Sequence, residues 1–489
     1  MNGLETVIGL EVHVQLRTVS KMFCGCPVRF GAPPNSLVCP VCLGLPGALP
    51  VANEEAVRLA VRAAHVLGCT VNATSEFVRK QYFYPDLPKG YQITQRADPL
   101  ARGGAIDLPP TRGGHRVRLH GLHLEEDAGK SIHDRFEGAT AVDLNRAGVP
   151  LIEIVTEPDL RSPEEARFAL SRLKQLLEHY AKVSHCNMEE GSLRVDANVS
   201  VRPAGAGNLG TRVEIKNLNS FGSVQRALAF EGRRMTQRLA AGRPVEAETR
   251  LYDAAQGRTR TLRGKEEERD YRYFPEPDLP LVELSASEVE GFRRGLPASP
   301  REIEERLVRQ FGFSEDRACQ IAATPERAEY LDAAVGARDS RFAVIAANMI
   351  MGEVAAVLNR RGGGSEADVV ESAELARLVE LRLQGALSSR TAALALRLLF
   401  EQAARGGRRL DVDELVRRRQ LSQVEDAGRL SEWVDRVLGG SPEEVRRYRS
   451  GDRKLLGYFM GEVMRASSGR ADPEAVRRRL ERALEEREG

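Results

Sequence analysis

Hydrophobic and polar residues alternate along four segments in the first half of the chain, which is the pattern of half-buried β-strands. In residues 6–16 one face carries Thr6, Ile8, Leu10, Val12, Val14 and Leu16, and the other carries Val7, Gly9, Glu11, His13 and Gln15. The same alternation occurs in residues 117–127, 193–202 and 212–216. These segments predict an antiparallel type of sheet with one buried face and one polar face.

The pattern changes to the helical period from about Leu296 onward, where Ala, Leu, Arg and Glu are frequent. Prolines in residues 274–280 mark the change, because repeated prolines continue neither a helix nor a strand. The glycine-containing segment 405–408 indicates a further boundary. The sequence therefore predicts an α+β fold with a sheet domain over residues 1–294, a helical domain over 295–405 and a small helical tail domain over 406–489.

Composition narrows the class of protein. The 489 residues are 42% hydrophobic and 29% charged, with a net charge of +2, which excludes a disordered, fibrous or histone-like chain. No run of 18 uncharged apolar residues occurs and the N-terminus lacks a basic start, so we expect neither a membrane span nor a signal peptide. Seven cysteines, an odd number, suit a reducing compartment better than a disulfide framework. These features predict a cytoplasmic protein.

Four of the cysteines lie close together in the sequence and form two short pairs, Cys24 with Cys26 and Cys39 with Cys42. Tetrahedral zinc takes four soft ligands from two such turns, so the spacing favours a structural zinc site in an insert at about residues 22–46. Since protein ligands would fill all four positions, no zinc catalysis is expected. The alternative is four reduced, partly buried thiols.

Acidic residues recur on the polar faces of the predicted strands. If these strands share one sheet, Glu11, His13, Glu125, Asp196 and Glu214 converge, Arg194 and Lys216 lie among them, and Glu153 and Glu157 are further candidates. Several acids beside a histidine and cations suit Mg²⁺ with cations over the phosphates of ATP. The alternative is a solvated face with incidental salt bridges, and spacing alone does not decide between the two.

Other segments are less specific. Residues 79–92 are dense in aromatic, cationic and turn residues, which is typical of an ordered lining loop or of a loop packed on the core. The basic clusters at 448–454 and 477–479 have acids around them, which favours solvated helix faces over RNA contacts. The chain has no P-loop, no GxSxG elbow and no amidase arrangement, so we expect it not to hydrolyse amides itself.

Several long strings in this sequence resemble the B subunit of the aspartyl/glutamyl-tRNA amidotransferases. They lie at residues 7–16, 23–26, 39–44, 79–92, 123–130, 142–158 and 212–221, and in the tail at 457–464 and 469–473. The middle helices match loosely, and Met349 stands where the family pattern suggests a tryptophan, which is a packing difference.

The resemblance implies a cradle domain with an antiparallel, glutamine-synthetase-like sheet, followed by the helical domain and a tRNA-binding tail. It implies that ATP phosphorylates the side-chain carboxylate of misacylated Glu-tRNA(Gln) or Asp-tRNA(Asn), and that ammonia then displaces phosphate. The ammonia would come from glutamine hydrolysed on the amidase subunit of the same complex, and a third, small subunit would complete a heterotrimer. Which of the two tRNAs is physiological does not follow from the sequence.

The resemblance also implies roles for individual residues. The catalytic candidates are Glu11, His13 and Glu125 first, then Glu126, Glu153, Asp196 and Glu214, with Arg194 and Lys216 neutralising developing charge. The Mg²⁺ ligands would come from Glu11, His13, Glu125, Asp196 and Glu214, and the structural zinc ligands would be Cys24, Cys26, Cys39 and Cys42. The passage for ammonia would be lined by Lys80, Tyr82, Lys89 and Tyr91.

Two other functions compete with this one. A non-catalytic tRNA-binding scaffold explains the cysteines and the tail, but it does not explain acids recurring on separate strands. A free-standing ATP-dependent ligase for a small amino acid explains the acids, but it leaves the additional helical domains without a role. Binding of Mg-ATP distinguishes a scaffold from an enzyme.

Overall fold

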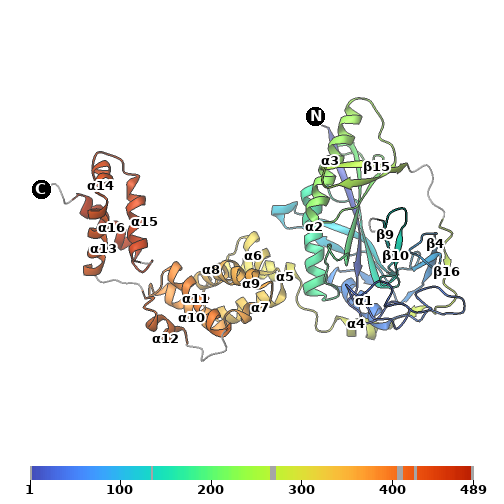
Figure 1. The fold of residues 1–489 in the computed structure, drawn as a ribbon, viewed down its shortest axis with the longest axis horizontal. Helices are drawn as coiled ribbons and strands as arrows, with labels where there is room; N and C mark the ends of the chain where they lie inside the picture. The colour runs from blue at the N-terminus through green and yellow to red at the C-terminus, as the bar shows by residue number, and fades with distance from the viewer. Residues whose placement is uncertain are drawn as a thin grey trace. The chain divides into compact units, whose positions relative to one another are not determined.

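The computed structural model describes residues 3–133, 136–264, 271–404, 411–422, 427–467 and 469–485. The chain forms two compact units, Met1–Arg301 and Glu302–Gly489. The first contains the sheet and the second is helical, which confirms the predicted α+β class (Figure 1). The boundary expected near 405–406 falls outside the described residues, so the three-domain division remains a prediction.

One large sheet organises the first unit. Its strands follow the order β15 (Arg258–Gly264), β14 (Glu248–Asp253), β13 (Val213–Lys216), β12 (Leu193–Pro203), β1 (Leu4–Gln15), β11 (Pro150–Thr156), β8 (Arg116–Glu126), β6 (Ala101–Arg102) and β2 (Thr70–Val71), with β7 (Ala105–Asp107) pairing with β8. All four segments predicted from alternation are strands of this sheet. The N-terminal strand β1 therefore lies inside the sheet, between two strands that come much later in the sequence.

The sheet is antiparallel except for one pair of strands. β13 and β14 run parallel, whereas the other strand pairs described in this sheet are antiparallel. The reason is the connection: helix α3 (Phe221–Ala240) carries the chain back along the sheet before β14 begins, and parallel neighbours need such a crossover.

The apolar face of the sheet is covered by α1 (Glu54–Val66), α2 (Pro163–Gln175) and α3 (Figure 1). Val12, Ile154 and Val195 of the central strands are at most 4% exposed and belong to the same core as Leu170 of α2 and Val224 of α3. Alternate residues of each strand are thus committed to the core, which leaves the remaining residues on the opposite, polar face.

Short strands and loops lie beside the large sheet. β4 (Val78–Gln81) pairs with β5 (Tyr91–Thr94) and with β16 (Phe274–Pro275), while β9 (Lys130–Ile132) pairs with β10 (Ala141–Asp143), and β3 (Thr74–Ser75) with β17 (Val282–Glu283). The small sheet with β4 brings the aromatic segment 79–92 against residues 271–276. The helix α4 (Ala286–Arg293) closes this unit.

The second unit is built of helices alone among its described residues. They are α5 (Pro300–Phe311, beginning at the unit boundary), α6 (Glu315–Ile321), α7 (Pro325–Val335), α8 (Ser340–Met349), α9 (Ala355–Arg361), α10 (Ser372–Leu383), α11 (Ser389–Ala404), α12 (Val412–Arg418), α13 (Ala427–Gly440), α14 (Pro442–Arg449), α15 (Leu455–Ala466) and α16 (Pro473–Glu485). The last four share a core that includes Trp433, Phe459 and Leu480.

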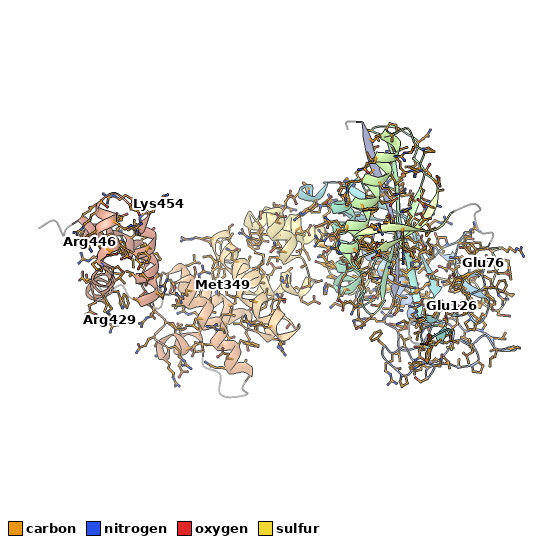
Figure 2. All side chains as sticks on the ribbon, turned by 45° about the horizontal axis from the view of Figure 1, so that its top comes forward. Glu76, Glu126, Met349, Arg429, Arg446 and Lys454 are labelled. Atoms are coloured by element: carbon orange, nitrogen blue, oxygen red, sulfur yellow. The ribbon has the colours of Figure 1, made fainter. Side chains whose placement is uncertain are left out.

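One helical stretch, Ser340–Arg361, is long and apolar enough to cross a membrane by length and composition. The sequence analysis did not identify this stretch as a candidate membrane span, because Glu353 interrupts the run of uncharged apolar residues. Half of its apolar window is buried, and Phe342, Met349 and Val354 are among the buried side chains. Figure 2 labels Met349 in this unit. This is the burial of a core helix, and it accounts for Met349 as a packing residue.

Candidate active site and metal centre

The polar face of the sheet brings together residues from separate strands because cross-strand partners point to the same side. His13 of β1 lies opposite Glu153 of β11 and opposite Arg194 of β12. Two residues earlier on the same strand, Glu11 lies opposite Asp196 of β12. The period of two that places these residues on one face is the signal that predicted them from the sequence.

The imidazole of His13 is surrounded by carboxylates. Its Nε2 atom lies 3.3 Å from Glu125 Oε1, 3.8 Å from Glu11 Oε1 and 4.0 Å from Glu153 Oε2. One ligand atom from each of Glu11, His13 and Glu153 fits within 4.8 Å of the others, which is compatible with a bound cation. Oxygen ligands with one imidazole suit a hard divalent ion such as Mg²⁺.

Burial is the main cause of the pKa shifts in this group. Burial, with the carboxylates of Glu153 and Asp196, raises the pKa of Glu11 to about 7, and burial raises the pKa of Glu125 well above its usual range. Burial, with the cations Arg194 and Lys80, lowers the pKa of His13 to about 3. A neutral imidazole is able to bind a metal ion, and the positive charge of that ion would offset the negative charges of the crowded carboxylates.

Asp196 and Glu214 lie at the side of this group and have a cation of their own. Lys216 Nζ lies 2.6 Å from Asp196 Oδ2 and 3.1 Å from Glu214 Oε1, and Thr249 Oγ1 donates to Glu214 Oε2 over 2.8 Å. Lys216 therefore lies on the polar face as predicted, but in the structure it neutralises these two acids.

Asp127 and His123 belong to the polar face and were not among the predicted site residues. Asp127 is 2% exposed and accepts a hydrogen bond from Arg194 Nη2 over 2.9 Å. His123 Nε2 lies 3.2 Å from Glu153 Oε2. The signal was present in the sequence, since both residues are two positions from Glu125 and a strand of period two puts all three on one side.

Glu126 is not brought together with the other acids. Glu126 lies in the first unit (Figure 2). Its carboxylate forms an ion pair with Lys89 Nζ and accepts a hydrogen bond from Ile93 N over 3.0 Å. The same pair takes Lys89 away from the polar face. Both residues therefore have structural partners, and the expected roles in catalysis and in the ammonia passage have no geometric support at these two positions.

Lys80 does lie beside the acidic group. Burial lowers its pKa, but Tyr273, Glu125 and Glu153 raise it more strongly, so the net shift is upward. Its Nζ lies 5.1 Å from the ring centre of Tyr271 and 6.0 Å from that of Tyr82.

Strand β16 brings this aromatic group together, because its pairing with β4 places the residues just before it, including Tyr271 and Tyr273, beside Lys80. The sequence had marked residues 274–280 only as a break. The fourth predicted passage residue, Tyr91, instead has the guanidinium of Arg79 4.2 Å from its ring centre. Glu157 lies away from the site and pairs with His120, 3.3 Å away.

The four cysteines of the predicted metal site converge. One sulfur atom from each of Cys24, Cys26, Cys39 and Cys42 lies within 4.8 Å of the others. A hydrogen bond from the Cys24 thiol lowers the pKa of Cys42 to about 4 and raises that of Cys24 in turn. Four sulfur donors at this spacing fit a tetrahedral soft or borderline ion, so the cluster is able to bind a metal.

Two family models match most of this chain. The GatB/GatE catalytic domain matches residues 6–290, and the GatB domain matches residues 329–484. The chain is 46% identical over 487 residues to an Anaeromyxobacter sp. (strain K) protein, which covers 99% of both chains.

Two further relatives give similar values. A protein of Nitratidesulfovibrio vulgaris (strain DP4) is 46% identical over 476 residues, covering 97% of this chain and 98% of its own. One of Halorhodospira halophila (strain DSM 244 / SL1) is 45% identical over 482 residues, covering 98% and 99%. All three relatives are named as the B subunit of an aspartyl/glutamyl-tRNA(Asn/Gln) amidotransferase, which confirms the resemblance seen in the sequence. The chain belongs to the family of the aspartyl/glutamyl-tRNA(Asn/Gln) amidotransferase B subunits.

Proposed function

We propose that this chain is the subunit of a glutamine-dependent amidotransferase that activates the side-chain carboxylate of misacylated Glu-tRNA(Gln) or Asp-tRNA(Asn) with ATP. The γ-phosphoryl group passes to a carboxylate oxygen and ADP leaves. Ammonia then attacks the acyl carbon, and phosphate leaves with its electron pair. The single observation that carries this proposal is the group of crowded carboxylates around His13, with cationic side chains at its edge.

The proposed roles of the site residues follow from their charges. Glu11, His13, Glu125 and Glu153 would hold Mg²⁺, with Asp196 and Glu214 beside them. Bound Mg²⁺ supplies charge neutralisation for the β- and γ-phosphates of ATP. Arg194 and Lys216 are proposed to bind phosphate oxygens, because both cations lie partly exposed at the border of the acidic group. Such fixed charges favour phosphoryl transfer by positioning and electrostatics.

Ammonia is proposed to arrive along Lys80 and Tyr82, with Tyr271 and Tyr273 added to the lining. Lys80 interacts electrostatically with Glu125 and Glu153 and lies near the ring of Tyr271. This supports a path that ends at the activated carboxylate. The ammonia would come from glutamine on the amidase subunit, with a third, small subunit that completes a heterotrimer in the cytoplasm. The helical unit and its tail would hold the tRNA by shape and backbone contacts.

The metal at Cys24, Cys26, Cys39 and Cys42 is proposed to be structural Zn²⁺. Four sulfur ligands leave no open coordination position, so the ion would stabilise the fold of residues 22–46 without taking part in the reaction.

The test is ADP release by the chain co-purified with its partners, given Mg-ATP, ammonium chloride and Glu-tRNA(Gln). We expect release to require the misacylated tRNA and to fall about 100-fold or more in Glu125→Gln. The matched control is Glu157→Gln, which changes an acid that pairs with His120 away from the site and leaves release unchanged. Release that persists in Glu125→Gln would move the chemistry to a partner protein and leave this chain as a tRNA scaffold.

A further inference from the structure

Lys21 is a lysine buried completely, at 0% exposure, beside the cysteine cluster. Its Nζ donates to Cys42 Sγ over 3.5 Å and to Leu144 O over 3.3 Å. Among the residues that the structure describes, no carboxylate forms an ion pair with this ammonium group, which distinguishes it from Lys89 and Lys216. Burying a cation is costly unless a negative group nearby compensates its charge.

The sulfur of Cys42 is the only atom in contact with Lys21 Nζ, among the described contacts, that can carry a full negative charge. The same sulfur also accepts a hydrogen bond from Cys39 N over 3.1 Å. Two N–H donors directed at one sulfur are the arrangement that stabilises a thiolate rather than a thiol.

Backbone hydrogen bonds on both sides of Lys21 hold it between neighbouring loops. Lys21 N donates to Cys26 O over 2.9 Å, and Met22 N donates to Gly148 O over 2.7 Å. Gly148 adopts φ +82°, and a Cβ atom there would lie 3.6 Å from Lys21 Cδ and from Cys42 Cβ and 3.9 Å from Oε2 of Glu126, whose carboxylate pairs with Lys89. The lysine is therefore enclosed between the two cysteine turns and the loop at residues 144–148, and its charge cannot reach solvent.

We propose that Lys21 is the counter-charge of the metal centre: it neutralises part of the excess negative charge of a divalent ion bound by four thiolates and thereby tightens metal binding. A divalent ion with four thiolates carries two excess negative charges, and burying them next to a fixed ammonium is less costly than burying them alone. The inference rests on the proposed zinc site, and it gives a function to a buried charge that the proposed reaction does not use.

The experiment measures zinc affinity of the full chain, co-purified with its partner proteins, by competition with a chromogenic chelator. Lys21→Met keeps the length and apolar packing of the side chain and removes its charge, so we expect the zinc Kd to rise about 10–100-fold. Lys21→Arg keeps a positive charge and should lose less. The control Lys130→Met removes an exposed lysine in the same unit and should leave the Kd unchanged.

Thermal unfolding of the same variants separates charge from packing. Without zinc, Lys21→Met should lose little stability, because the buried ammonium group that it removes forms no ion pair with a carboxylate among the described residues. The rise in Tm on adding zinc should be smaller in the variant. An equal loss of Tm in the metal-free and zinc-loaded forms would indicate packing alone and overturn the inference.

Two outcomes for the metal remain distinguishable. A parent protein that retains zinc, with a Lys21→Met affinity within about twofold of it, overturns the role of Lys21 and leaves the zinc site standing. A parent protein with under about one tenth of an equivalent of zinc overturns the metal centre itself. Neither result affects the carboxylate group, which the ADP-release assay tests separately.

Discussion

Arg194 Nη2 donates to Asp127 Oδ1 over 2.9 Å, joining the start of β12 to the residue that follows β8. Asp127 Oδ2 accepts a hydrogen bond from Gln15 Nε2 over 3.0 Å at the end of β1, and Arg146 Nε lies 3.6 Å from the same oxygen. Asp127 thus has partners on two strands and one loop, and it fixes the direction in which Arg194 crosses the polar face. We assign Asp127 as a positioning residue that acts through Arg194.

Asp127→Asn should lower the rate of ADP release because Arg194 loses its charged partner. The loss should appear mainly in kcat if Arg194 stabilises charge in the transition state. In a double-mutant cycle, Asp127→Asn should add little to Arg194→Gln, since both changes remove one interaction. Asp159→Asn is the matched control, because Asp159 pairs with Arg118 on the same sheet away from the site. Fully additive losses would show that Asp127 does not act through Arg194.

The two lysines predicted to line the ammonia passage should behave differently. Lys80→Met should lower glutamine-dependent activity more than activity with supplied ammonium, because Lys80 adjoins the aromatic group near the acids. Lys89→Met leaves the buried Glu126 carboxylate without its partner and should cost about 3–5 kcal/mol of stability, with both activities falling together. Tm and the two activities are measured side by side. A donor-selective loss at normal Tm in Lys89→Met would restore Lys89 to the passage.

The stability of the metal-free protein should depend on pH through Glu11. Its pKa in the folded protein is about 7, above its usual value of 4.5, so the folded state holds a proton that the unfolded state releases between these values. The stabilisation is therefore complete below pH 4.5 and is lost as pH rises toward 7.

Mg²⁺ requires the carboxylate form, so its affinity should increase over the same pH interval. Tm recorded against pH, with and without Mg²⁺, measures both effects. Glu11→Gln should flatten the metal-free curve, and an unchanged slope in that variant would assign the pH dependence to another group.

Gly44 holds the cysteine loop against the Lys89 side chain. It adopts φ +66°, and an added Cβ would lie 2.6 Å from Lys89 Cγ and 3.0 Å from its Cα. Gly44→Ala should therefore cost about 1–3 kcal/mol and weaken zinc retention. Gly47→Ala is the control, since Gly47 has φ +83° but no atom within 4 Å of the added Cβ. If both variants lose the same Tm, backbone strain alone is responsible and the contact with Lys89 contributes nothing.

Period-two alternation was enough to predict which strand residues share the polar face. It placed Glu11, His13, Glu125 and Asp196 correctly, because a strand has only two faces. The cysteine spacing likewise predicted a cluster, since two short turns can close on one ion.

The sequence did not show which side chains and strands contact one another. Alternation places Glu125 and Glu126 on opposite faces of β8, but it does not show that Glu125 contacts His13 or that Glu126 pairs with Lys89. The small sheet formed by β4 and β16 joins segments far apart in the chain, so Tyr271 and Tyr273 could not be linked to Lys80 from local pattern. The parallel pairing of β13 with β14 was missed for a similar reason. It depends on the crossover through α3, which the alternation of residues does not reveal.

The central position of β1 has a consequence for how the protein is made. β1 is synthesised before the other strands of the large sheet, yet its register partners include Val155 for Glu11 and Arg194 for His13. During synthesis β1 cannot pair with its neighbours in the sheet until most of the first unit has been made. Non-local pairing of this kind slows folding and leaves strand edges exposed. Acquisition of ATP-dependent activity should therefore be a late, all-or-none event in folding, and truncated chains that end before β12 should depend on chaperones and aggregate without them.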